Sequence, residues 1–139
     1  MGKSKVEIKW KELMSFEAKV NGHTFMLDAD ESVGGKNQGP RPKPLLLVAL
    51  AGCTGMDVVA ILEKMKVKFD DFSVDVSGEL TEEHPKYYHK LHIEYKFKGE
   101  DLPLDKIQKA INLSQERYCG VSAMLGKAAE ITHEIILED

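Results

Sequence analysis

The sequence has few of the residues that mark several common classes of protein. Among its 139 residues there are two cysteines, two arginines and one tryptophan, and the net charge is −4. A protein that binds nucleic acid or an anionic membrane through its charge needs a basic surface. The composition gives no electrostatic support for either partner, and we expect neither.

Two cysteines are also too few for a disulfide framework, and in a reducing compartment they are expected to be thiols. The first ten residues, MGKSKVEIKW, contain no apolar segment typical of a signal peptide, so we expect a cytoplasmic protein. Cys53 and Cys119 are 119 − 53 = 66 residues apart, and only tertiary structure could bring them together. On composition alone, both would be small buried hydrophobic residues.

Recognisable cofactor sites are missing as well. The five histidines do not combine with the cysteines at zinc-site spacing. The glycines near Gly34 and Gly39 do not follow a strand and open a helix, as a nucleotide-binding loop would. We therefore expect no metal and no cofactor. The chain shows no repeat or linker, and its length suits a single domain spanning residues 1–139.

The first third of the sequence is predicted to form three strands. Apolar residues alternate with charged ones from Val6 to Trp10, and the pattern continues from Phe16 to Val20, as expected of half-buried strands. Asn21-Gly22 suits a type I′ hairpin turn that leads into a strand from Thr24 to Leu27. Residues 30–43 are rich in glycine and proline and are predicted to form a loop.

One long apolar segment follows, from Pro44 to Leu62, and Asp57 is its only charged residue. The length would suit a membrane span, but Asp57, Thr54 and two glycines in its second half favour a buried helix, so we expect no membrane partner. Small residues surround Cys53 on one helical face. Because the helix is apolar nearly all round, it must be covered on all sides, which a chain of this size has difficulty doing alone. The segment therefore predicts a homodimer.

Apolar and polar residues alternate again in the second half of the sequence. Strands are predicted from Phe72 to Leu80 and from His89 to Phe97, then helices from Pro103 to about Glu116 and from Val121 to Ala129, and a last strand from Ile131 to Leu137. The order β-β-β-α-β-β-α-α-β predicts an α+β fold with antiparallel sheet and a long buried central helix.

The two cysteines are the best candidates for catalytic residues. A thiol peroxidase needs a thiolate, a neighbouring group that stabilises it, a second thiol, and apolar walls that exclude water. Burial would raise the pKa of Cys53 unless a cation or hydrogen-bond donor compensates. The only arginines are Arg41, in the loop before the helix, and Arg117, and either could also be an ordinary surface charge. Cys119 opens the short second helix, whose free N–H groups lower a thiol's pKa. Asp57, four residues after Cys53, is interpreted as a structural hydrogen-bonding residue, since a carboxylate would raise the thiol's pKa.

Two segments carry a family resemblance: LLLVALAGCTGMDVVAILEKMK, from Leu45 to Lys66, and RYCGVSAML, from Arg117 to Leu125. They resemble the two cysteine motifs of the OsmC/Ohr family, the osmotically inducible protein C and organic hydroperoxide resistance proteins. The C-T-G-M-D-V motif is similar to that of the OsmC-like branch. The resemblance implies an OsmC-like fold and an intertwined homodimer with active sites at its interface.

The resemblance also implies a reaction cycle. Cys53 would attack a hydroperoxide, form a sulfenic acid and condense with Cys119, the resolving cysteine, to a disulfide that a dithiol such as protein-bound lipoamide would reduce. The family commonly has a glutamate at the start of the long helix, where this chain has Pro44. Its peroxide-orienting arginine often lies in the N-terminal strands, where this chain has none before Arg41, so Arg41 is the candidate for that role. Without the arginine–glutamate relay, activity would be weak, restricted in substrate, or dependent on Arg41 in a rearranged role.

Three hypotheses follow for the function. The first is a thiol-dependent hydroperoxide reductase that favours organic hydroperoxides, because the walls around Cys53 should be apolar. The second is a non-catalytic family member, a redox-sensing or small-ligand-binding dimer that kept the fold and lost the relay. The third gives both thiols a purely structural role.

Overall fold

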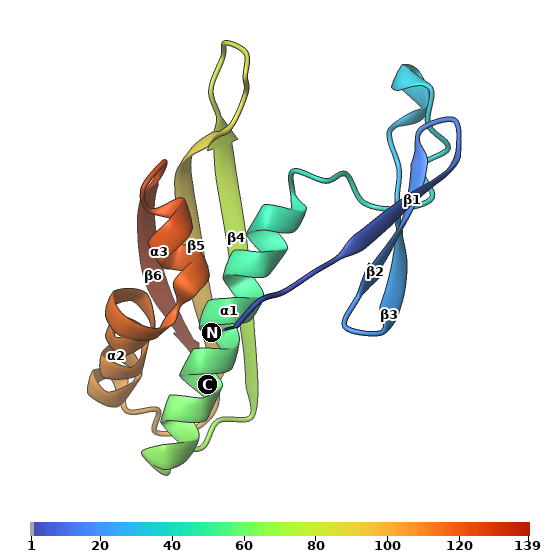
Figure 1. Ribbon diagram of the computed structural model, residues 1–139. Coiled ribbons are helices and arrows are strands. Elements are labelled where there is room, and N and C mark those ends of the chain that lie inside the picture. Colours follow the sequence, from blue (N-terminus) through green and yellow to red (C-terminus); the bar gives the residue numbers. More distant parts are fainter. Residues whose placement is uncertain (1) are drawn as a thin grey trace. The chain divides into compact units, whose positions relative to one another are not determined.

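The computed structural model describes residues 2–139 (Figure 1). The elements follow the predicted order, with a 3-10 turn, η1 (Glu31–Val33), and a π-helical turn, η2 (Ser114–Tyr118), added to it. The chain divides into two compact units, one ending at Leu46 and one running from Leu47 to Asp139. Each unit has its own three-stranded sheet. The single-domain interpretation of residues 1–139 stays a prediction.

The N-terminal unit contains an antiparallel sheet of β1 (Glu7–Glu12), β2 (Ser15–Val20) and β3 (His23–Leu27), in that order. Val20 pairs with His23, so a two-residue hairpin connects β2 to β3, as the sequence predicts. Asn21 has a φ of 49° and Gly22 a φ of 81°, the positive values that a type I′ turn requires at both positions.

A buried carboxylate organises the loop that follows β3. Asp28 is 3% exposed and accepts hydrogen bonds from the backbone N–H groups of Ala29, Lys36 and Gln38, at 2.7, 3.2 and 3.1 Å. Burial alone would raise the pKa of Asp28, but these donors and the charge of Arg41 hold that pKa below its ordinary value. The loop predicted for residues 30–43 is therefore an ordered turn around one carboxylate.

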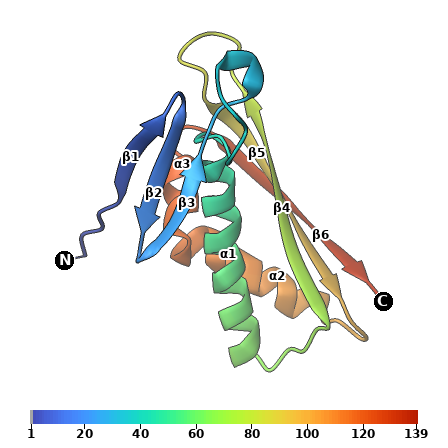
Figure 2. The same cartoon turned by 90° about the vertical axis from the view of Figure 1, so that its right-hand side faces the viewer.

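The C-terminal unit packs its helices on one face of its sheet (Figures 1 and 2). The helices are α1 (Leu45–Lys64), α2 (Leu104–Leu113) and α3 (Gly120–Leu125), and the strands are β4 (Asp71–Leu80), β5 (Tyr88–Lys98) and β6 (Glu130–Glu138). The central strand β5 supplies the middle of the core with four alternate buried residues, Leu91, Ile93, Tyr95 and Phe97. This alternation is the period-2 pattern that the sequence shows.

The sheet of this unit is mixed, and the prediction of antiparallel pairing is wrong for its last strand. β4 pairs antiparallel with β5, but β6 runs parallel to β5. The connection from β5 to β6 explains the direction, because it contains α2, η2 and α3 and carries the chain back to the end of the sheet where β5 begins. Both helices are shorter than predicted: α2 ends at Leu113 and α3 at Leu125.

Within the C-terminal unit, the buried residues of the long helix α1 lie on one face. Its buried residues are Leu50, Thr54, Val58 and Leu62, spaced by four so that they form one stripe. On the uncovered side, Met56 is 77% exposed. Length and composition alone would allow α1 to span a membrane. Its buried stripe belongs to the core of the C-terminal unit, as the interpretation as a core helix requires. The predicted cover on all sides of the helix stays a prediction.

Gly39 approaches the backbone of β3 closely. An added Cβ would lie 2.0 Å from the carbonyl oxygen of Met26, a backbone atom that cannot turn aside. We expect Gly39→Ala to lower the free energy of unfolding by about 1–3 kcal/mol, because the loop must shift. Denaturant unfolding would measure this. Gly120→Ala is the control, since its Cβ would meet no atom within 4 Å; equal losses in the two variants would contradict the prediction.

Candidate active site

Cys53 lies at the border between the buried and exposed faces of α1. Its side chain is half-buried and packs against the hydrophobic core of the C-terminal unit. The next residue, Thr54, is fully buried, whereas Met56 is 77% exposed. A thiol at this border has apolar walls on one side and remains partly accessible on the other.

Cys119 lies in the break between η2 and α3. It is 3% exposed, and its backbone N–H donates to the Ser114 carbonyl at 2.7 Å. Its Sγ accepts a hydrogen bond from the N–H of Ser122 at 3.3 Å, so Cys119 is the N-cap of α3. The predicted helix start at this cysteine is confirmed.

The fold brings Cys53, Asp57 and Cys119 together. The two Sγ atoms and a carboxylate oxygen of Asp57 all lie within 4.8 Å of one another. Both cysteines are free thiols. Asp57 accepts a hydrogen bond from the Ser114 hydroxyl at 3.0 Å, which confirms the prediction that it is a hydrogen-bonding residue. Because Asp57 lies close to the thiols, its negative charge also acts on the pKa of Cys53.

Burial raises the pKa of the Cys53 thiol above its ordinary value. The neighbouring Cys119 thiol and the negative charge of Asp57 raise this pKa further, while the N–H of Val121 acts in the opposite direction. The predicted effect of burial on Cys53 is thus confirmed. The charged groups that shift this thiol in the described chain are acidic, so they disfavour the thiolate rather than stabilise it.

A buried hydrogen-bond network joins α1, β5 and η2 beside the thiols. The Thr54 hydroxyl lies 2.7 Å from the Tyr95 hydroxyl and 2.8 Å from that of Ser114. The Gln115 amide donates to the hydroxyls of Thr54 and Tyr95, at 3.1 and 2.9 Å, and its carbonyl accepts from Ser122 at 3.1 Å. Sequence reasoning missed this network. The signal available was a threonine on the inner face of an otherwise apolar helix.

The two arginines differ in their surroundings. The Arg41 guanidinium donates to the side chain of Asn37 at 2.8 Å and to the Gly39 carbonyl at 3.0 Å, and it lies 3.5 Å from an Asp30 carboxylate oxygen. All three partners belong to the N-terminal unit, so a role of Arg41 at Cys53 stays a prediction. Arg117 is exposed and lies over the ring of Tyr118, at 5.8 Å from its centroid, as expected of a surface cation.

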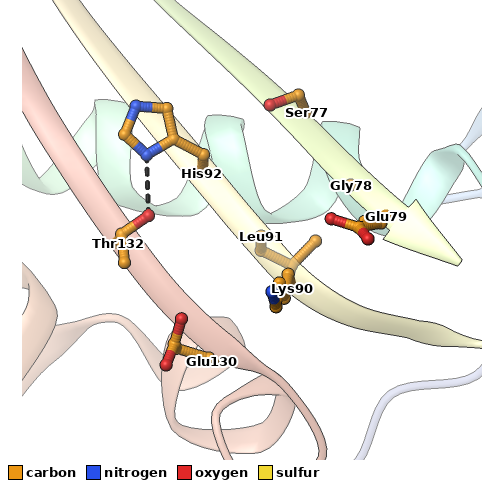
Figure 3. Close-up of a pocket in the computed structure, with 8 residues that line it drawn as sticks. All are labelled: Ser77, Gly78, Glu79, Lys90, Leu91, His92, Glu130 and Thr132. Carbon is orange, nitrogen blue, oxygen red and sulfur yellow. Dashed lines mark hydrogen bonds between the residues drawn. The ribbon is translucent and has the colours of Figure 1, made fainter. Parts of the chain in front are cut away.

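A separate polar pocket of about 370 Å³ lies on the sheet of the C-terminal unit (Figure 3). His92 shares hydrogen bonds across the strands there: its Nδ1 lies 2.7 Å from the Thr132 hydroxyl, and its Nε2 lies 3.1 Å from a Glu134 oxygen. The lining residues are Ser77, Gly78, Glu79, Lys90, Leu91, His92, Glu130 and Thr132. Neither cysteine is among them, so this pocket is distinct from the thiol site.

The fold is α+β, and it brings together a thiol on a long helix and a thiol at the start of a short helix. These features place the protein among those that carry a pair of neighbouring thiols. The chain belongs to the OsmC-like protein family, whose model matches residues 35–134. Protein YhfA of Escherichia coli strain K12 is 33% identical to it over 127 residues, which cover 91% of this chain and 92% of that protein.

Solved structures share the fold over nearly their full lengths. A hypothetical protein from Aquifex aeolicus VF5 has a TM-score of 0.84 and 29% identity, with 100% of both chains covered. The organic hydroperoxide resistance protein OhrB of Bacillus subtilis has a TM-score of 0.62 and 17% identity, covering 96% of this chain and 98% of that one. At that identity, the likeness to OhrB concerns the fold alone.

The influence of Asp57 on Cys53 can be tested in a Cys119→Ser background, where Cys53 is the only thiol. Since burial and the carboxylate both raise the pKa of Cys53, its alkylation by iodoacetamide should rise with pH only above the range of an unburied cysteine. Adding Asp57→Asn removes a negative charge and should move the midpoint to lower pH. Glu63→Gln, an exposed change on the same helix, should leave it in place. An unchanged midpoint in Asp57→Asn would disprove the electrostatic contribution.

Proposed function

We propose that this protein is a thiol-dependent hydroperoxide reductase in which Cys53 is the peroxidatic cysteine and Cys119 the resolving one. The observation that carries the proposal is the approach of the two free thiols, whose Sγ atoms lie within 4.8 Å of each other although 66 residues separate them (119 − 53). Membership of the OsmC-like family supports a redox role for such a pair.

The proposed cycle has three steps. The Cys53 thiolate attacks the outer oxygen of the hydroperoxide, the O–O bond breaks, and the alkoxide leaves with a proton as an alcohol while the sulfur becomes a sulfenic acid. The Cys119 thiol then displaces the sulfenic oxygen as water, forming a disulfide. A dithiol, such as the dihydrolipoamide of a lipoylated protein, donates two electrons and two protons to restore both thiols and is itself oxidised to a disulfide.

The assignment of the two roles rests on exposure. Cys53 is half-buried, so an entering peroxide has a route to it, whereas Cys119 is 3% exposed. Cys53 also packs against the hydrophobic core, and this apolar wall favours an organic hydroperoxide over hydrogen peroxide. The hydrogen bond from the N–H of Ser122 fixes the position of the Cys119 sulfur, which suits a resolving cysteine.

We propose Arg41 as the residue that orients the peroxide. It is the arginine nearest in sequence to α1, and the ordered loop around Asp28 fixes its guanidinium through Asn37 and Gly39. These two bonds use one of its terminal nitrogens, and the other faces Asp30 at 3.5 Å. A fixed, forked cation can hold a peroxide oxygen where charge develops.

A homodimer is part of the proposal. The uncovered side of α1 carries Val48, Met56 and Val59, which are 63%, 77% and 42% exposed. A groove lined by Gly52, Gly55, Met56, Val59, Ala60, Glu63 and Phe72 follows this side. An apolar helix face of this kind is covered in solution, and a second copy would bury it. We also propose that the protein acts in the cytoplasm, where dithiol reductants keep its cysteines reduced.

A redox sensor is the second candidate, favoured by the electrostatics of Cys53. Burial and two acidic neighbours raise its pKa, and Pro44 stands where the family commonly has glutamate. Both features would slow attack on a peroxide without preventing the disulfide. A disulfide that forms once, slowly, and without turnover would favour the sensor.

Steady-state reduction of cumene hydroperoxide with dihydrolipoamide tests the enzyme directly. Cys53→Ser should show only the uncatalysed rate, because it lacks the nucleophile. Cys119→Ser should consume about one equivalent of peroxide and yield a sulfenic acid that dimedone traps. Arg41→Gln should lower kcat/KM about 100-fold, the effect of losing one donor to developing charge. A wild-type rate no higher than that of Cys53→Ser would refute the proposal.

The dimer can be tested separately by light scattering or sedimentation. Met56→Lys places a charge on the uncovered face of α1 and should weaken dimerisation by at least about tenfold, because the interface would bury an unpaired ammonium. Ser73→Lys, on the exposed face of β4, should leave the dimer intact. A monomeric wild-type protein at micromolar concentration would exclude the dimer.

A further inference from the structure

We propose that Cys53, Cys119 and Asp57 form a binding site for a thiophilic divalent metal ion, with Zn²⁺ as the best match. Neither the family relationship nor the proposed reaction assigns a metal to these residues. The spacing of histidines and cysteines in the sequence does not indicate the site either, because it depends on Asp57 and on the approach of two distant segments.

The three ligand atoms match zinc in kind and in spacing. Zinc in proteins takes thiolate, imidazole and carboxylate ligands in a tetrahedron, with Zn–S near 2.3 Å and Zn–O near 2.0–2.2 Å, so the ligand atoms around one ion lie roughly 3.5–3.8 Å apart. The two Sγ atoms and the Asp57 oxygen already lie within 4.8 Å of one another. Small rotations of the side chains would close the difference. Two thiolates select against Mg²⁺ and Ca²⁺, which prefer oxygen ligands.

Outer contacts already hold two of these ligands in place. The Ser114 hydroxyl donates to Asp57 at 3.0 Å, and the Ser122 N–H donates to the Cys119 sulfur at 3.3 Å. Ser114 is itself fixed by the buried hydroxyl of Thr54 at 2.8 Å. Such supporting hydrogen bonds orient the ligands of metal sites and raise affinity. With three protein ligands, the fourth position would be open to water, whereas structural zinc sites have four protein ligands.

Metal binding would oppose the proposed peroxidase chemistry. An ion bound to both sulfurs occupies the lone pair with which Cys53 attacks a peroxide and keeps Cys119 from the disulfide. Oxidation of the pair to a disulfide by a hydroperoxide, which is reduced to an alcohol and water, would in turn release the ion. The inference does not rest on peroxidase activity, since it concerns the reduced thiols alone, and it can succeed or fail independently.

Co²⁺ is a spectroscopic probe for this site, used with the reduced, tag-free full chain and without peroxide. We expect one Co²⁺ per chain, with tetrahedral d–d bands and a thiolate-to-cobalt charge-transfer band, all lost when Zn²⁺ is added. Cys53→Ser and Cys119→Ser should each remove most of the charge-transfer band. Asp57→Asn should weaken binding by about tenfold or more, and Glu63→Gln on the same helix should leave it unchanged.

Two further measurements keep the test independent of folding defects. Wild-type protein oxidised to the disulfide should give no cobalt spectrum, and reduction should restore it. Circular dichroism should show that each cysteine variant remains folded. The absence of a charge-transfer band in reduced wild-type protein, or its persistence in Cys119→Ser, would overturn the metal site whatever the peroxide assay shows.

Discussion

The buried hydrogen bonds between α1 and η2 are the constraint on which the thiol site depends. Thr54 lies on the sheet-facing stripe of α1, where its hydroxyl would be costly to bury without partners. Tyr95 and Ser114 supply those partners at 2.7 and 2.8 Å, and Ser114 also bonds Asp57. Because Ser114 begins the π-helical turn that Cys119 directly follows, fixing Ser114 sets where Cys119 meets α1.

The same network explains how the C-terminal unit buries several polar side chains beside its hydrophobic core. Among the described residues, no buried side-chain nitrogen or oxygen lacks a hydrogen-bond partner. A fully satisfied network stabilises one arrangement over its alternatives, because any shift leaves a buried hydroxyl unpaired. The wide turn η2 contributes by directing the N–H of Cys119 to the Ser114 carbonyl at 2.7 Å. Local backbone geometry and buried hydroxyls thus act together to position one sulfur.

Much of this fold could be predicted from periodicity and turn chemistry. Three features depend on local sequence preferences that the tertiary structure retains: the alternation along β5, the Asn21-Gly22 hairpin and the apolar length of α1. The direction of β6 could not be predicted, because apolar and polar residues alternate in the same way in parallel and antiparallel strands. Only the path of the chain through α2 and α3 decides the direction. The cysteine motifs and Asp57 were visible in the sequence, whereas Gln115 and Tyr95 become site residues only when three distant segments meet.

The electrostatics of the thiol pair link its two proposed properties. Two thiolates and a carboxylate within 4.8 Å of one another would repel each other, so a cation is needed for all three to be charged together. An arginine would lower the pKa of Cys53 and leave its lone pair free for a peroxide, whereas a metal ion would bind that lone pair and block the attack. The neutralising charge would therefore decide between the two proposed properties. With a guanidinium nearby the two thiols would act as a reductant, and without one the two thiols and Asp57 would bind a metal ion.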